Sequence, residues 1–329
     1  MMTGYELVKK AIEFDGPERL PFFQHVYPKA PDDVCDSWEM DRQKAGWFFD
    51  NADPDDWGCI WRRTEVKNMG QVVAGPLDDW SKLASYIPPD PTDDLYFKQI
   101  DREIANPGEK YVCLTSHFTL FERLHMLHGF TQTLIDFYYE PKKIEQVLDM
   151  ILDFKIRQID EVHRRYGDRV HGLFLTDDWG TQNAPFISPE LFDSFFLERY
   201  RTLVGRYHEH GYHFILHSCG RINDLVDRFI DAGVDMMNMQ QPRAYGIDEI
   251  GDRFSGKIAF LATADIQSTL PSNDPVAIRK ECHELCDKWG TPRGGLVVFN
   301  YGDAEGINVK EEMSTVMFEA FKEKMHLQS

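Results

Sequence analysis

The sequence predicts an α/β protein of the (β/α)8 barrel class. From about residue 108 onward, short β-rich runs alternate with long amphipathic helices, and several of the helices end in glycine just before the next run. With two earlier runs this gives eight candidate strands, at 20–28, 55–63, 111–118, 171–180, 213–220, 235–242, 258–265 and 295–303. Eight strands joined by helices are what a closed parallel barrel requires. No glycine-rich phosphate motif follows the first run, which weakens the alternative of an open dinucleotide-binding sheet.

The ends of the predicted helices support parallel strands. One helix begins with Ser188 as its N-cap and Pro189 at its first position, and it ends at Gly211. The next helix ends at Gly233, which suits a left-handed residue after a helix. A repeated succession of strand, helix, glycine and strand is typical of parallel βαβ units.

Length and composition limit the classes of function. The chain of 329 residues has no internal repeat or Gly/Ser linker, so we expect one domain over 1–329 with a helical and hairpin extension at its N-terminus. Acidic residues outnumber basic ones 55 to 36, and the formal net charge of −19 argues against nucleic acid and membranes as partners. Six cysteines are too few for a disulfide scaffold. No membrane-length apolar run or signal peptide is present, so we expect a cytoplasmic protein.

The predicted strands end in polar residues, at the edge where barrels of this class place their active sites. In the run HFILHSCG, His217 and Cys219 share a face because alternate strand residues point the same way. An imidazole and a thiolate side by side suit a tetrahedral cation such as Zn²⁺. Asp303, at the end of the last predicted strand, is the first choice for a third ligand, with Asp177 and Glu122 in reserve.

The same pair allows a simpler interpretation. His217 can be a hydrogen-bonded core histidine, and Cys219 can be an inert buried thiol. Their position at the end of a strand favours the metal site, because that edge of a barrel faces the cavity.

The run TDDWGTQ at 176–182 is a candidate substrate clamp that combines a carboxylate, an aromatic wall and an amide. Because neighbouring strand residues face opposite ways, only one of Asp177 and Asp178 should enter the pocket. Trp179 and Gln182 are expected to contact the substrate. Other aromatic, imidazole and amide side chains near predicted strands are further candidates for the lining of the pocket: His25, Tyr27, His117, Phe118, Gln240 and Tyr301.

The run HSCGRINDLVDRFIDAGVDMMNMQQP resembles the uroporphyrinogen decarboxylase superfamily, specifically its cobalamin-dependent methyltransferase branch. Other segments fit in the same order: GPERLPF, FERLHMLHGFTQTLIDFYYEP, LTDDWGTQNAPFISPELFDSFFLERYR and GGLVVFNYGD. The resemblance spans nearly the whole chain and is most specific over 171–242. It implies a (β/α)8 barrel, in agreement with the strand count.

In the methyltransferase branch, a zinc held by a His-x-Cys pair and a later Cys activates a thiol methyl acceptor. His217 and Cys219 match the pair, whereas Gly302 and Asp303 stand at the later Gly-Cys position. A carboxylate ligand makes the metal harder and better suited to polarising a substrate oxygen than to activating a thiol. The decarboxylases of the family carry paired arginines after the first strand. This chain has FFQHVYPKAPDD there, which argues against uroporphyrinogen decarboxylation.

The resemblance therefore implies a zinc-assisted methyltransferase. It would move a methyl group from a small methoxylated aromatic substrate to the cob(I)alamin of a separate corrinoid-binding protein, as the first component of an O-demethylase system does. Asp177 or Glu122 would donate a proton or hold the substrate. Three alternatives are a methylcobamide:thiol methyltransferase, a metal-independent decarboxylase or lyase of a small acid, and a non-catalytic binding barrel. A homodimer is expected by analogy with the family.

Overall fold

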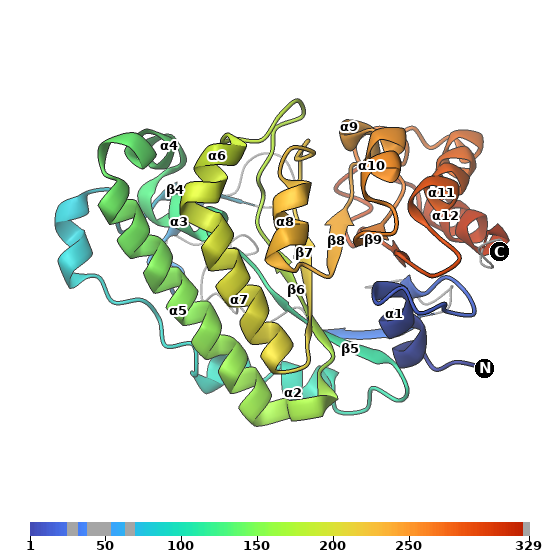
Figure 1. Ribbon diagram of the computed structural model, residues 1–329, viewed down its shortest axis with the longest axis horizontal. Coiled ribbons are helices and arrows are strands. Elements are labelled where there is room, and N and C mark those ends of the chain that lie inside the picture. The colour runs from blue at the N-terminus through green and yellow to red at the C-terminus, as the bar shows by residue number, and fades with distance from the viewer. Residues whose placement is uncertain (25–31, 38–53, 63–69, 325–329) are drawn as a thin grey trace.

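The computed structural model describes residues 1–24, 32–37, 54–62 and 70–324. Its centre is an α/β barrel of eight parallel strands surrounded by helices (Figure 1). The strands in chain order are β1 (Phe22–Phe23), β2 (Val34–Ser37), β5 (Tyr111–Ser116), β6 (Gly172–Thr176), β7 (His213–His217), β8 (Met236–Met239), β9 (Ala259–Ala262) and β10 (Leu296–Phe299). The predicted barrel class is thereby confirmed.

Asp33 joins the two ends of the sheet. Hydrogen bonds link neighbouring strands in the order β1, β10, β9, β8, β7, β6, β5, β2, which leaves β1 and β2 at the ends. The backbone N–H of Asp33 donates to the carbonyl of Phe22 (2.9 Å), and its carboxylate accepts from the N–H of Phe22 (2.9 Å). Arg19 holds the same carboxylate with two nitrogens, at 2.6 and 2.7 Å. The barrel is closed at this seam by an ion pair as well as by backbone bonds.

The helices follow the strands around the outside of the barrel. The α-helices are α1 (Gly4–Ile12), α2 (Ile100–Glu103), α3 (Phe121–His128), α4 (Phe130–Tyr139), α5 (Pro141–Tyr166), α6 (Pro189–Phe192), α7 (Glu198–Glu209), α8 (Val226–Ala232), α9 (Pro242–Tyr245), α10 (Ile247–Phe254), α11 (Pro275–Trp289) and α12 (Glu311–Glu323). Short 3-10 turns lie at η1 (Trp80–Ser85), η2 (Asp94–Tyr96) and η3 (Gly167–Arg169), and a π-helical turn, η4 (Asp193–Leu197), precedes α7. No helix in the described part of the chain combines the length and the apolar character that a membrane span requires.

One predicted strand was wrong. The run at 55–63 contributes no barrel strand: Ile60–Arg62 (β3) instead pairs antiparallel with Gln71–Ala74 (β4) in a separate hairpin. The barrel position is taken by β2, a four-residue strand that pairs with β5. Its sequence, VCDS, follows two aspartates and contains a third, so it lacks the apolar run that marks the other strands.

Alternate strand residues build two separate cores. Phe174, Ile215, Leu261 and Phe299 belong to the cluster inside the barrel, whereas neighbours such as Leu216 belong to the cluster between the strands and the helices. Helix α1 closes the amino end of the barrel, where it contributes Val8, Ala11 and Ile12 to the inner cluster. The carboxyl ends of the strands are therefore the end at which a site can open.

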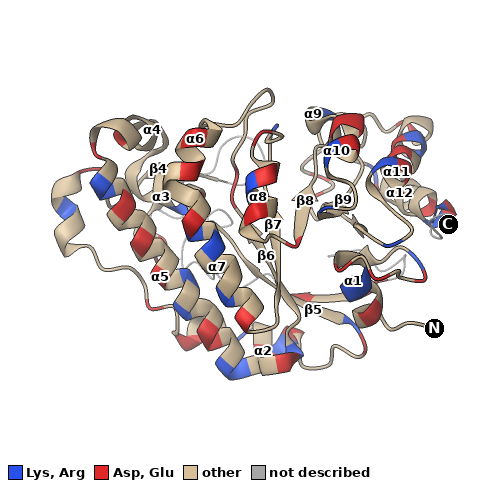
Figure 2. Cartoon of the chain, viewed as in Figure 1, with Lys and Arg blue, Asp and Glu red and all other residues tan. Residues whose placement is uncertain are grey.

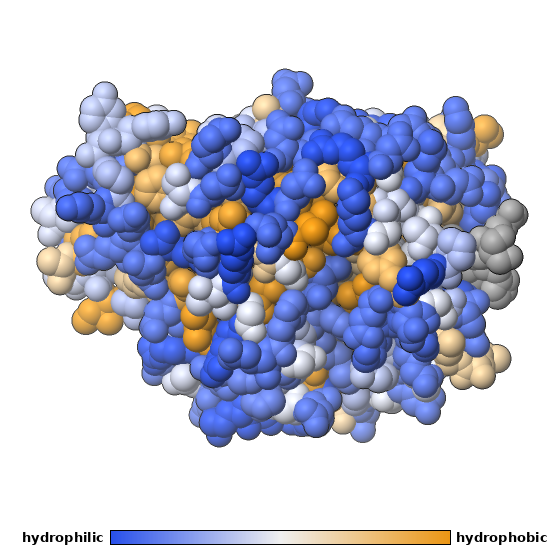
Figure 3. Space-filling model, viewed as in Figure 1, coloured by the Kyte–Doolittle hydropathy of each residue, from blue (hydrophilic) through white to orange (hydrophobic). Residues whose placement is uncertain are grey.

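Charge and hydropathy follow this layering. The outward faces of α5 and α7 carry both acidic and basic residues, whereas the inner strands carry few of either (Figure 2). On the face shown in Figure 3, hydrophilic residues predominate, and hydrophobic residues show mainly between the helices. This pattern is typical of amphipathic helices around a buried sheet.

Two glycines let the loops after β6 and β7 touch. Gly220 has φ +81°, and a Cβ built on it would lie 2.2 Å from the backbone carbon and oxygen of Gly180. A Cβ on Gly180 would lie 2.9 Å from the backbone carbon of Gly220. Backbone packs directly on backbone at this point, immediately after Cys219 in the chain.

We expect Gly220→Ala to lower the free energy of unfolding by about 3 kcal/mol, because the change adds both a left-handed strain and a backbone clash. Gly205→Ala is the matched control, since Gly205 lies within helix α7 and a Cβ there meets nothing within 4 Å. The control should gain about 0.5–1 kcal/mol from helix propensity. Urea unfolding of both variants measures the difference, and equal stabilities would contradict the close contact.

Candidate metal centre

Three side chains of different chemistry meet at the carboxyl ends of β6 and β7. The Nε2 atom of His217 lies 3.4 Å from Sγ of Cys219 and 3.6 Å from Oδ1 of Asp178. One possible ligand atom from each of the three residues lies within 4.8 Å of the others. The His217 side chain is 12% exposed and that of Asp178 is 36% exposed, so a small ligand can reach the group from solvent.

The register of the two strands explains this meeting. Thr176 of β6 pairs with His217 of β7, so the residues two positions further on, Asp178 and Cys219, also come side by side. The N–H of Cys219 donates to Oδ1 of Asp178 at 2.7 Å, which ties the two strand ends together. The predicted alternation of His217 and Cys219 places both side chains at this point.

Asp177 faces the other side of the barrel wall. Its side chain is fully buried and accepts three backbone N–H bonds from the first turn of α3: Leu120 (3.2 Å), Phe121 (3.1 Å) and Glu122 (2.7 Å). The hydroxyl of Tyr200 donates a fourth bond at 2.6 Å. Burial raises the pKa of Asp177 to about 6, although these bonds act in the opposite direction. Asp177 thus fixes the start of α3, and Asp178 is the neighbour that joins the group.

Glu122 places a second carboxyl group beside the centre. It is 8% exposed, and the hydroxyl of Thr176 donates to its Oε2 at 2.9 Å. Burial, with the charges of Asp178 and Asp177, raises the pKa of Glu122 well above its ordinary value. The raised pKa favours the protonated form of this carboxyl group, which is the form that can act as a proton donor.

The electrostatics of the group favour a cation. Burial raises the pKa of the Cys219 thiol, and the nearby carboxylates of Asp178 and Glu122 raise it further. Each negative group thus opposes the ionisation of the thiol, and a divalent cation would reverse that effect. One nitrogen, one sulfur and one oxygen donor fit Zn²⁺ with a fourth position left for water or substrate. His217, Cys219 and Asp178 are the residues that could hold it.

The predicted third ligand, Asp303, lies elsewhere. Strand β10 ends at Phe299, and Asp303 is an exposed loop residue that accepts the N–H of Gly306 at 2.9 Å. It closes its own turn and is not part of the described group of three donors. Tyr301 is half-buried, and burial raises its pKa, with Asp303 and Cys219 acting in the same direction.

The other predicted substrate contacts fall in different places. Trp179 is fully buried and packs between Phe121 (4.7 Å between ring centres) and Phe196 (4.6 Å) on the helix side of the strands, so the structure does not bring it to the centre. Gln182 is exposed in the loop after β6. Both predictions of substrate contact stay predictions.

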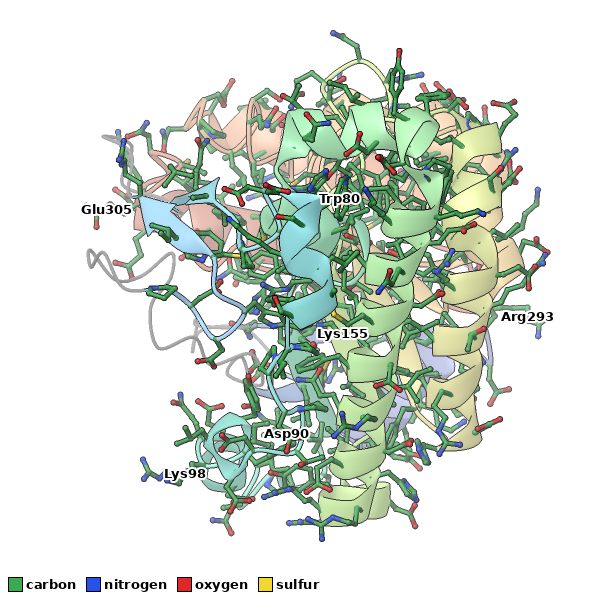
Figure 4. The ribbon with its side chains drawn as sticks, turned by 90° about the vertical axis from the view of Figure 1, so that its left-hand side faces the viewer. Trp80, Asp90, Lys98, Lys155, Arg293 and Glu305 are labelled. Carbon is green, nitrogen blue, oxygen red and sulfur yellow. The ribbon has the colours of Figure 1, made fainter. Side chains whose placement is uncertain are left out.

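His117 and Phe118 directly follow β5 and are buried. The buried ammonium of Lys155 from α5 holds this end, because its Nζ donates to Ser116 Oγ (2.6 Å) and to the carbonyl of His117 (2.7 Å). Figure 4 shows Lys155 inside the molecule beside α5, whereas Lys98 lies at the periphery. The predicted residues His25 and Tyr27 lie outside the described residues.

Sequence reasoning missed Asp178 as a donor and Asn238 as the partner of His217. Oδ1 of Asn238 lies 2.7 Å from Nδ1 of His217, and Gln240 Nε2 donates to the same oxygen at 2.7 Å. Gln240, predicted to contact substrate, thus lies behind the imidazole. The sequence did contain a hint of this role for Asp178. Leu175 and Trp179 are apolar and alternate with Asp177, so these three residues face the helices and Asp178 faces the inside of the barrel.

One family model matches most of the chain. Residues 98–324 match the family model described as uroporphyrinogen decarboxylase (URO-D). A search of curated proteins finds no match.

Similar solved structures include Dispersin B, with 12% identity and a TM-score of 0.37 over 70% of this chain and 77% of that one. The native xylanase 10B from Thermotoga maritima has 10% identity and a TM-score of 0.37, with 69% and 91% covered. The type I 3-dehydroquinate dehydratase from Clostridium difficile has 11% identity and a TM-score of 0.28, with 98% and 90% covered. These likenesses are too distant to bear on activity.

The two adjacent aspartates should respond differently to the same change. Asp177→Asn leaves one acceptor for four donors in a buried place, so we expect a loss of about 3 kcal/mol or more in the free energy of unfolding. Asp178→Asn keeps an oxygen for the Cys219 N–H, so its stability should stay within about 1 kcal/mol of the wild type. Its zinc affinity should fall by about tenfold or more. Urea unfolding and chelator competition measure the two effects, and a reversed order would refute the assignment.

Proposed function

Because the chain belongs to the uroporphyrinogen decarboxylase (URO-D) family, we propose that it is an enzyme whose Asp178, His217 and Cys219 bind zinc for methyl transfer. The methyl donor would be a small methoxylated aromatic compound. The acceptor would be the cob(I)alamin of a separate corrinoid-binding protein. The observation that carries this proposal is the meeting of three different donors at the open end of the barrel.

The chemistry of the third donor supports an oxygen substrate. Bound zinc would supply Lewis acidity toward the ether or phenol oxygen of the substrate. In the proposed centre the third donor is the carboxylate of Asp178, and a carboxylate ligand makes the metal better suited to polarising an oxygen. This donor comes from the end of β6 and not, as predicted, from the end of the last strand. The same observation weakens the alternative of transfer to a thiol, for which a second cysteine ligand is expected.

The residues around the centre supply the proton. In the proposed reaction the O–CH₃ bond breaks, the methyl group passes to the cob(I)alamin acceptor, whose electron pair forms the new bond, and the substrate oxygen retains the pair of the broken bond. Glu122, whose pKa burial and the neighbouring aspartates raise, would give that oxygen its proton. Thr176 orients the Glu122 carboxyl through its hydroxyl.

A metal-independent decarboxylase or lyase of a small acid is the second candidate. It is favoured by the raised pKa of Glu122, since a protonated carboxyl group beside the centre can protonate a carbanion without a metal. Uroporphyrinogen itself is a poor substrate for this chain, because the segment after the first strand lacks paired arginines for its carboxylates.

We expect about one zinc per chain in the purified protein, and less than about a tenth of that in the double variant His217→Ala, Cys219→Ala. The control double variant, His208→Ala with Cys35→Ala, also removes one imidazole and one half-buried thiol, but at sites away from the centre. It should keep its zinc. Mass spectrometry measures the zinc content per chain, and equal zinc contents in both double variants would refute the site.

An anaerobic assay with cob(I)alamin and a panel of methoxyarenes tests the reaction itself. Formation of methylcobalamin should be lost when zinc is removed by chelation and restored when zinc is returned. Release of CO₂ from small acids that survives chelation would support the second candidate instead. Thiol-dependent demethylation of methylcobalamin would show transfer to a thiol.

A further inference from the structure

Asn238 lies behind His217 as a fully buried amide with three bonds. It belongs to β8 and pairs in register with His217 of β7. Its Nδ2 donates to the carbonyl of Leu261 at 2.9 Å. Its Oδ1 lies 2.7 Å from both Nδ1 of His217 and Nε2 of Gln240.

These partners fix which way the amide points. A backbone carbonyl only accepts hydrogen bonds, so the atom facing Leu261 must be the amide nitrogen. A flipped amide would set two oxygens against each other at Leu261. The oxygen of Asn238 therefore faces His217, and because an amide oxygen only accepts, Nδ1 of His217 must carry the proton.

We infer that Asn238 is a positioning residue that selects the Nδ1–H tautomer of His217 and leaves the Nε2 lone pair free. Nε2 is the atom that faces Sγ of Cys219 and Oδ1 of Asp178. A neutral imidazole has one N–H, so a proton held at Nδ1 leaves the nitrogen at the centre able to bind a cation. The role of this tautomer in leaving Nε2 free for a cation rests on the proposed zinc site.

Gln240 strengthens the arrangement from the far side. Its Nε2 shares the Asn238 oxygen with His217, so two donors meet one acceptor and the oxygen cannot turn away without losing both. Inside the barrel, the ring of Phe174 lies nearly parallel to the imidazole, with 6.1 Å between ring centres and 16° between planes. The ring is thus oriented by a bond at one nitrogen and by packing on its face.

The test reads the tautomer directly on metal-free protein labelled with ¹⁵N-histidine. Two-bond ¹H–¹⁵N spectra at about pH 8, where an ordinary imidazole is neutral, distinguish the two tautomers. The signals of His217 are identified by their loss in His217→Ala. The wild type should show the Nδ1–H form. Asn238→Leu should show the Nε2–H form and bind zinc about 10–100-fold more weakly in chelator competition.

Two further variants separate positioning from a general loss of structure. Asn238→Asp keeps an acceptor for Nδ1–H, although its second oxygen faces the carbonyl of Leu261 and should lower the free energy of unfolding. It should still restore the Nδ1–H form and bring zinc affinity back to within about tenfold of the wild type. Asn223→Leu is the matched control, because Asn223 is a buried amide that donates to the carbonyl of Tyr245 at 2.7 Å. It should leave both the tautomer and the zinc affinity unchanged.

The outcomes distinguish this inference from the proposed function. An Nε2–H form in the wild type, or an unchanged tautomer in Asn238→Leu, overturns the inference even if zinc binds. A wild type that shows the Nδ1–H form but binds no zinc confirms the orientation and overturns the proposed metal site. Weakened zinc binding in Asn223→Leu equal to that in Asn238→Leu would reduce the role of Asn238 to core packing.

Discussion

Alternation of side chains at the end of β6 is the constraint on which the rest of the structure depends. Asp177 and Asp178 are adjacent, so their carboxylates must leave the strand on opposite sides. On the outer side, Asp177 collects the free N–H groups of the first turn of α3. On the inner side, Asp178 meets His217 and Cys219. The start of α3 also carries Glu122, so one dipeptide positions both the donors and the neighbouring acid.

The centre gathers groups that folding alone would keep apart. Asp178, Glu122 and Cys219 lie close together in a partly buried place. Burial first, and neighbouring carboxylates second, raise the pKa values of Glu122 and of the Cys219 thiol. Such arrangements cost stability and are characteristic of functional sites. A bound cation would offset that cost, whereas a proton on Glu122 relieves only part of it.

The sequence was sufficient for the features that depend on local pattern. Strand runs and helix-ending glycines led to the barrel, and period-two alternation paired His217 with Cys219 within one strand. The short strand β2 was not predicted, because its four residues include Asp36 and do not form an apolar run. Asp178 was not predicted as the third donor either. Its position depends on the register between β6 and β7 and on which side of β6 faces the inside of the barrel. Asp303 seemed suitable by position, but its loop folds back on Gly306.

The contact between Gly180 and Gly220 restricts how the mouth of this barrel can diversify. Where two loops meet backbone to backbone, neither can be lengthened or given a side chain without moving the other, and Cys219 directly precedes that seam. The part of the rim formed by the ends of β6 and β7 is thus a rigid support for the donors. Changes that adapt the mouth to substrates of another shape are therefore expected in the loops that follow the other strands.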